Sequence, residues 1–156
     1  MREELFEIPD DLVIIGIALR TSPATAAADI PAFWQRFLQE GIPAGLPRRN
    51  DDASVYAVYC DYESDHRGPY TMVLGVAAGA TTPVPAGRRR VRVPQGRYAR
   101  FVANGDPHQV VWKAWMHINE QWDRRDRRRY LADFERYPAD STSGQEIHAD
   151  VVVGLA

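Results

Sequence analysis

Apolar and aromatic runs of strand length recur along the first half of the chain. Residues 12–20, L-V-I-I-G-I-A-L-R, form a nearly continuous apolar run, which is typical of a central strand. Residues 55–62 and 70–77 are rich in valine and tyrosine, and a polar turn over residues 63–69 separates them. We therefore expect a central strand, followed later by a hairpin with a loop longer than the minimal one.

Two segments repeat their apolar residues with the period of an α-helix. Residues 24–40 carry one apolar stripe that includes Phe33 and Phe37. A second stripe runs through residues 107–122, and Asp106 is expected to be the N-cap of that helix. Each helix therefore has one face suited to burial against a sheet.

The second half of the chain repeats the order of the first. Strand-like segments at residues 97–103, 130–138 and 146–154 surround the second helix, so that each half reads strand, helix, strand, strand. This order predicts an α+β fold built from a duplicated βαββ repeat, over about residues 10–78 and 88–156. We expect one domain with a curved antiparallel sheet, both helices on one side and a central groove.

The duplication can be written as an alignment of the strands that follow each helix. It matches Tyr62 with Tyr137, and it places Cys60 on Glu135. Identity between the two segments is weak, but the order of the elements agrees. Tyr62 and Tyr137 would then face the groove from the two halves.

Glu135 lies in the middle of the predicted strand at residues 130–138. Side chains alternate across a strand, so Glu135 and Tyr137 share one face. One interpretation is a solvated face of an edge strand. The other is a carboxylate held among aromatic rings, where its pKa rises and it acts as a counter-charge or a proton carrier.

The composition argues against several kinds of protein. A single cysteine, Cys60, leaves no internal disulfide, and the chain starts without an apolar run of signal-peptide length. No window approaches the roughly 20 apolar residues of a membrane span. We therefore expect a cytoplasmic protein that does not contact membranes. The histidines are scattered, and no nucleotide-binding or hydrolase motif is present, so no metal and no other cofactor are expected.

Charge is distributed unevenly along the chain. The net charge is −2, with −6 over residues 1–78 and +4 over residues 79–156. Arginine runs at residues 88–92 and 124–129 raise the question of nucleic-acid binding. The overall acidic balance gives little attraction for phosphates, and no DNA- or RNA-binding motif accompanies the arginines. Direct nucleic-acid binding is therefore not expected.

Six segments, which together span most of the chain, carry a resemblance to a known family. They are V-I-I-G-I-A-L-R-T-S (13–22), D-I-P-A-F-W-Q-R-F (29–37), Y-A-V-Y-C-D-Y-E-S-D (56–65), G-P-Y-T-M-V-L-G-V (68–76), V-P-Q-G-R-Y-A-R-F (93–101) and D-F-E-R-Y-P (133–138). Their order and spacing resemble the gyrase-inhibitor-like (GyrI-like) small-molecule-binding domains. These are the effector-binding halves of AraC-type and MerR-type regulators, and they also occur as stand-alone proteins.

The resemblance implies an aromatic pocket at the pseudo-two-fold axis with one buried glutamate, which falls here on Glu135. Relatives bind organic cations and drug-like amphipathic molecules, so a small hydrophobic or cationic organic molecule is the expected partner. The sequence names no protein partner, and because these 156 residues leave no room for one, we expect no DNA-binding domain beside the effector-binding domain. The candidate ligand-binding residues are Glu135, Tyr137, Trp34, Trp115, Tyr62 and Phe37.

A hydrolase is the alternative to a binding protein. Some relatives are similar to hydrolases that open strained cyclopropane rings with a glutamate and a tryptophan. Glu135 would then be the catalytic residue that activates water, and the tryptophan would be Trp34 or Trp115. Hydrolysis also needs a second polar group near the water, and the sequence offers no firm one, so binding is the favoured function.

Overall fold

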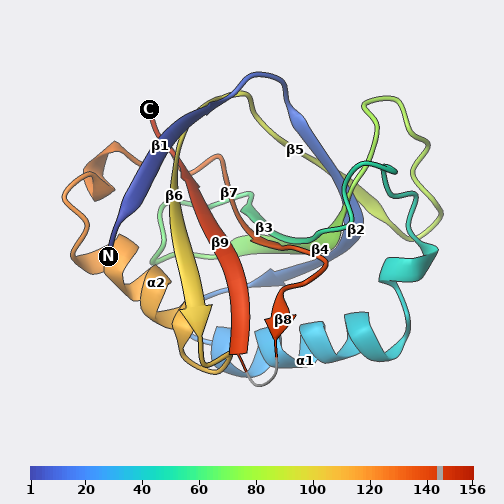
Figure 1. Ribbon diagram of the computed structural model, residues 1–156, viewed down its shortest axis with the longest axis horizontal. Coiled ribbons are helices and arrows are strands. Elements are labelled where there is room, and N and C mark those ends of the chain that lie inside the picture. The colour runs from blue at the N-terminus through green and yellow to red at the C-terminus, as the bar shows by residue number, and fades with distance from the viewer. Residues whose placement is uncertain (144–145) are drawn as a thin grey trace.

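The computed structural model describes residues 1–143 and 146–156 and shows one antiparallel sheet with two helices on one side (Figure 1). The strands are β1 (Glu3–Ile8), β2 (Leu12–Thr21), β3 (Val55–Cys60), β4 (Tyr70–Ala77), β5 (Arg89–Val93), β6 (Gly96–Gly105), β7 (Ala132–Tyr137), β8 (Thr142–Ser143) and β9 (Glu146–Gly154). The helices are α1 (Ala26–Gln39) and α2 (Val110–Glu120), with short 3-10 turns at Pro43–Gly45 and Arg125–Arg127. The predicted α+β class is confirmed.

The order of strands across the sheet is symmetric. It runs β1-β6-β9-β7-β3-β4-β2-β5, with β8 paired to β9. One βαββ unit is β2-α1-β3-β4 and the other is β6-α2-β7-β9, and the β3–β7 pair joins them. The strand that precedes each unit pairs with the other unit. β1 precedes β2 but pairs with β6, and β5 precedes β6 but pairs with β2. The predicted duplication is therefore present in the topology.

The predicted alignment of Cys60 with Glu135 is wrong. Ala57 lies directly opposite Glu135 in the β3–β7 pair, and opposed side chains share a face of the sheet. Cys60 is three residues beyond Ala57 and points to the other face, where it packs in an apolar cluster with Phe134. Weak identity does not fix a register, and a slip by one residue moves a side chain to the opposite face. The match of Tyr62 with Tyr137 used the same offset and is wrong with it.

The ladder pairings give the correct correspondence between the halves. β2 and β6 both have 10 residues and match end to end. Following the pairings from β2 through β4 to β3, and from β6 through β9 to β7, then brings Ala57 onto Glu135. The two-fold axis of the fold therefore passes between these two residues.

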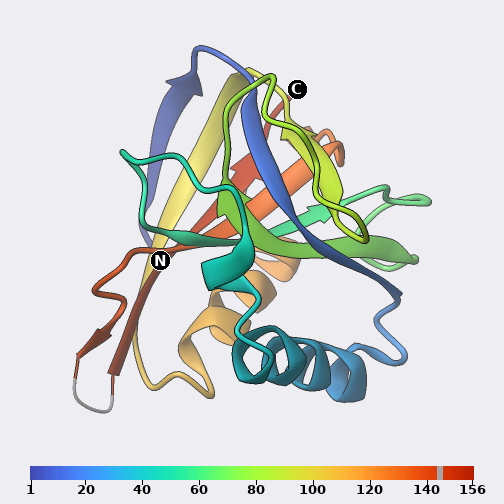
Figure 2. The same ribbon diagram turned by 90° about the vertical axis from the view of Figure 1, so that its right-hand side faces the viewer.

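The two faces of the sheet bury different apolar clusters. On the helix side, α1 packs Phe33 and Phe37 onto β2 and β4, and α2 packs Ile118 onto β6 and β9. On the other side the sheet curls around a third cluster that includes Val58 and Tyr98. Figure 2 shows both helices below the strands, which curl above them. No helix in the described part of the chain is long and apolar enough to cross a membrane.

The second helix starts later than predicted. The carbonyl oxygen of Asp106 accepts hydrogen bonds from the amides of Gln109 and Val110, so the chain makes a turn before the helix begins. Gln109, not Asp106, is the N-cap residue. The same turn precedes α1, where the carbonyl oxygen of Ser22 accepts from two amides. The Ser-Pro and Asp-Pro pairs therefore mark equivalent turns of the two halves.

Candidate binding site

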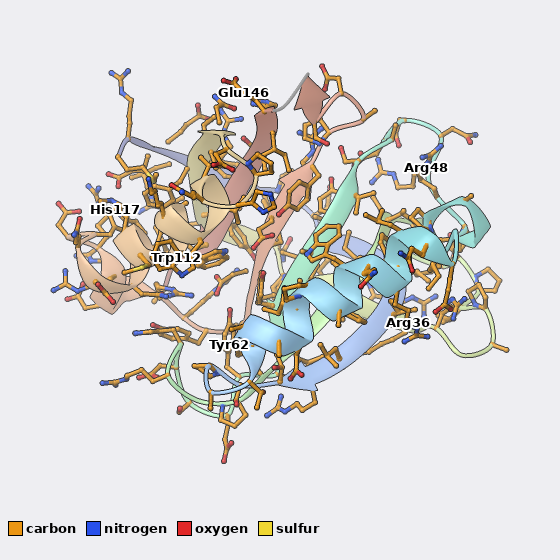
Figure 3. All side chains as sticks on the ribbon, turned by 90° about the horizontal axis from the view of Figure 1, so that it is seen from below. Arg36, Arg48, Tyr62, Trp112, His117 and Glu146 are labelled. Carbon is orange, nitrogen blue, oxygen red and sulfur yellow. The ribbon has the colours of Figure 1, made fainter. Side chains whose placement is uncertain are left out.

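A cavity of about 290 Å³ lies between the two helices and the helix side of the sheet. Its wall is mainly aromatic: Tyr59, Tyr62 and Tyr70 come from the β3–β4 hairpin, and Trp112 and Trp115 come from α2. Figure 3 shows Tyr62 and Trp112 in the region between the two helices. The first turn of α1 and the segment before it complete the wall. The cavity is therefore formed by both halves of the fold.

Glu135 lies behind this aromatic wall and is only 2% exposed. The hydroxyl group of Tyr59 and Nε1 of Trp115 donate hydrogen bonds to its Oε2 atom, at 2.6 and 2.7 Å. The hydroxyl group of Tyr137 donates to its Oε1 atom at 2.5 Å. All three donors are neutral groups, and two of them, on Tyr59 and Trp115, belong to residues that line the cavity.

Burial raises the pKa of Glu135, because the carboxylate loses the water that would stabilise its charge. The hydrogen bonds from Tyr137, Tyr59 and Trp115 oppose this rise but do not cancel it. Burial also raises the pKa of the Tyr59 and Tyr137 hydroxyl groups, and the nearby carboxylate adds to the effect. Both tyrosines are therefore neutral donors, and no cation in the described part of the chain forms an ion pair with Glu135.

A second buried carboxylate on the same strand, Asp133, has its own cation. Nη2 of Arg128 lies 2.9 Å from Oδ2 of Asp133, and both side chains are 1% exposed. The hydroxyl group of Tyr62 donates to the same oxygen at 2.6 Å, and the amide of Gly154 donates to Oδ1 at 2.8 Å. Asp133 and Arg128 together are neutral, so Glu135 is, among the described residues, the buried carboxylate beside the cavity that lacks a cation of its own.

Trp115 and Trp34 have different places. Trp115 donates its indole N–H to Glu135 and lines the cavity, whereas Trp34 packs edge-on against the ring of Tyr137 with 5.1 Å between ring centroids. The structure thus brings Trp115 and Tyr137 directly onto the carboxylate. Trp34 supports Tyr137 from the side of α1.

Other site residues differ in how well the sequence indicates them. Tyr62 lies in the cavity wall, but Phe37 is fully buried in the core under α1 and is not part of that wall. Tyr59, Tyr70 and Arg128 line the cavity and were not among the candidate residues. The alternation that puts Ala57 and Tyr59 on one face would have found Tyr59 once the β3–β7 register was known.

Among the described residues, no three His, Cys, Asp or Glu side chains group as metal ligands.

A duplicated βαββ sheet with two helices on one face, an aromatic cavity between those helices and a buried carboxylate behind it fits the class of effector-binding domains. The chain belongs to the Cass2 family of integron-associated effector binding proteins, which matches residues 6–151.

Known proteins similar to this chain agree with that family. The putative transcriptional regulator protein YobU of Bacillus subtilis (strain 168) is 28% identical over 144 residues, which cover 90% of this chain and 89% of YobU. The structure of SAV2435 bound to tetraphenylphosphonium has a TM-score of 0.83 at 20% identity, covering 100% of this chain and 94% of SAV2435. An integron cassette protein from the mobile metagenome of Vibrio cholerae has a TM-score of 0.66 at 24% identity, with coverages of 97% and 95%. The two structures show the same fold.

Proposed function

We propose that this protein binds a hydrophobic organic cation in the aromatic cavity and that Glu135 supplies the counter-charge. One observation carries this proposal: the buried carboxylate accepts hydrogen bonds from three neutral groups and has no ion-pair partner among the described residues. The likeness to SAV2435, whose structure contains tetraphenylphosphonium, supports the same class of ligand. The single cysteine is consistent with binding in the cytoplasm.

The aromatic wall suits a cation that carries little water of its own. Tyr59 and Trp115 stand between the carboxylate and the cavity, with 5.2 Å between their ring centroids, and Tyr70 lies 5.7 Å from Tyr59. A cation over such a ring gains roughly 0.5–2 kcal/mol. We expect the positive centre of the ligand to lie against these rings, with Glu135 directly behind their donor atoms.

Isothermal titration calorimetry with two ions of the same shape tests the role of charge. Tetraphenylphosphonium should bind with a Kd in the micromolar range, about −8 kcal/mol, whereas the anion tetraphenylborate should not bind. Glu135→Gln keeps the size of the side chain and removes its charge. It should weaken tetraphenylphosphonium binding by about 1–3 kcal/mol.

Asp52→Asn is the matched control for this substitution. Asp52 also accepts a hydrogen bond from a tyrosine hydroxyl group, that of Tyr56 at 2.6 Å, but it does not line the cavity. Its replacement removes a carboxylate of the same kind and should leave the affinity unchanged. Equal affinity of Glu135→Gln and wild type for tetraphenylphosphonium would show that Glu135 is not the counter-charge.

Hydrolysis of strained electrophilic compounds has less support than binding. The lone pairs of Oε2 are both taken by Tyr59 and Trp115, which line the cavity, and the free lone pair of Oε1 lies beside Tyr137, which does not line it. A general base needs a free lone pair aimed at the water that it activates. The arrangement therefore favours a fixed counter-charge, and binding is the function that we propose.

A further inference from the structure

We propose that the cationic ligand also carries a carbonyl oxygen and that the side-chain amide of Asn119 recognises it. This inference rests on the proposed function, because it concerns the same cavity. Asn119 and Arg128 both line the cavity, and the Nη1 atom of Arg128 donates a hydrogen bond to Oδ1 of Asn119 at 2.6 Å. The contact determines which end of the amide is left for a ligand.

The chemistry of arginine fixes the orientation of Asn119. A guanidinium group has only donors, so Asn119 must present its oxygen to Arg128, and its two amide N–H groups remain. Arg128 cannot easily release that oxygen. Its other terminal nitrogen is paired with the buried Asp133, and its guanidinium carbon lies 4.3 Å from the ring centroid of Tyr130. Turning the amide over would place N–H groups against N–H groups at a buried charge.

Asn119 lies one helical turn from the residue that contacts the carboxylate. Trp115 and Asn119 are four residues apart on α2, so they share a face with about 6 Å of rise between them. Trp115 donates to Glu135, which makes that end of the cavity acidic. The cavity therefore has an acidic aromatic end and, about one turn away, an end with an oriented amide donor.

The donor end does not repel a cation. The charge of Arg128 is balanced by Asp133 at 2.9 Å. His66 lines the same part of the wall, and burial together with the nearby Arg128 lowers its pKa, so it is neutral at pH 7. This end of the cavity is therefore suited to a neutral hydrogen-bond acceptor on the ligand. The ligand class is an aromatic or amphipathic cation with a carbonyl oxygen about one ring away from its positive centre.

Two phosphonium ions of nearly equal shape test this inference. (4-Acetylphenyl)triphenylphosphonium carries the carbonyl oxygen, and (4-isopropylphenyl)triphenylphosphonium has a methyl group in its place. The wild-type protein should bind the acetyl compound about 5- to 10-fold more tightly, the usual value of one hydrogen bond. In Asn119→Asp the oxygen facing Arg128 is kept and the amide donor is lost. The isopropyl compound should then bind at least as tightly as before, because a negative charge is added, and the preference for the acetyl compound should disappear or reverse.

Gln121→Glu is the control, because it makes the same amide-to-carboxylate change on an exposed residue just beyond α2 and outside the cavity wall. It should keep the wild-type preference. Equal affinity of wild type for the two compounds would overturn this inference and leave the proposed function standing, whereas failure of both to bind would overturn both. A preference that persists in Asn119→Asp would show that Asn119 is not the donor.

Discussion

Two carboxylates on β7, two residues apart, differ in what surrounds them. Asp133 has an arginine and a backbone amide as partners, and its charge is balanced inside the protein. Among the described residues, Glu135 has only the hydroxyl groups of two tyrosines and an indole N–H as partners. Neutral donors stabilise a carboxylate but leave its charge uncompensated. Glu135 is therefore the residue whose ionisation should respond to a bound cation.

The affinity for a permanent cation should fall as the pH is lowered. Burial raises the pKa of Glu135 above its ordinary value of 4.5, so the carboxylate takes up a proton at a higher pH than an exposed glutamate does. The charge-dependent part of the affinity is complete above the raised pKa. It should fall about tenfold for each pH unit below that pKa. Titrating tetraphenylphosphonium into wild type from about pH 8 to about pH 4 measures this dependence.

The effect of protonating His66 must be distinguished from that of protonating Glu135 in that experiment. It also lines the cavity, and gaining a proton would add a positive charge that weakens cation binding. Burial lowers the pKa of His66, so this effect also appears on the acid side. Glu135→Gln keeps His66, so the part of the pH dependence that is lost in this variant belongs to the carboxylate. Identical profiles for wild type and Glu135→Gln would contradict a role for the carboxylate.

The sequence indicated part of the site at the level of single residues. Glu135 and Tyr137 were predictable, because alternation along one strand places them on the same face. Arg128 was not, since an arginine run reads as a solvated loop, whereas tertiary packing buries this one member against Asp133. The choice between Trp34 and Trp115 depended on which helix face approaches the carboxylate, and only the packed structure provides that information.

At the scale of elements, β2 and β4 approach each other unusually closely at one pair of glycines. Gly16 and Gly75 are direct cross-strand partners, and a Cβ atom on Gly16 would lie 1.9 Å from the carbonyl oxygen of Leu74. Gly16→Ala should therefore force the strands apart and lower the free energy of unfolding by about 3 kcal/mol or more. Urea unfolding followed by tryptophan fluorescence measures the loss.

Gly45→Ala is the comparison for that substitution. A Cβ atom on Gly45 would meet nothing within 4 Å, so this change should leave the stability within about 0.5 kcal/mol of wild type. If the Gly16→Ala protein is as stable as the Gly45→Ala protein, β2 and β4 can move apart at little cost in free energy.

The elements themselves were largely predictable, because most have a clear period. The helical stripes and the long apolar runs gave α1, α2 and the β3–β4 hairpin, with ends shifted by a few residues. β1 was missed. It is an edge strand with Glu3, Glu4 and Glu7 among its six residues, so charge hides the strand pattern, and its partner β6 lies about 90 residues further along the chain.

At the scale of the whole molecule, the exchanged strands fasten the two halves together. β1 pairs along six residues with β6 of the other half, and Phe6 and Ile8 pack on the cluster inside the curl of the sheet. Deleting residues 1–9 removes this ladder and exposes the edge of β6. We expect the melting temperature to fall by about 10 °C or more and the protein to self-associate. Differential scanning calorimetry and light scattering measure the two effects.

A substitution within β1 controls for changes at the surface alone. Leu5 is 44% exposed, so Leu5→Ser keeps the ladder and removes little buried area. It should change the melting temperature by at most about 2 °C. If the truncated protein has the same melting temperature as the wild type, the exchanged strand does not hold the halves together.

The axis between Ala57 and Glu135 has a consequence for how such a cavity can originate. In a dimer of two identical half-chains, the residue beside the axis would be present twice, directly opposite itself and about 5 Å away. Two buried carboxylates at that distance cannot both be ionised, and two alanines would carry no charge. A pair of carboxyl groups would share one proton and hydrogen-bond to each other, whereas a single chain whose halves are free to differ can place one carboxylate opposite an alanine. Fusion of the halves thus allows a symmetric framework to hold an asymmetric site.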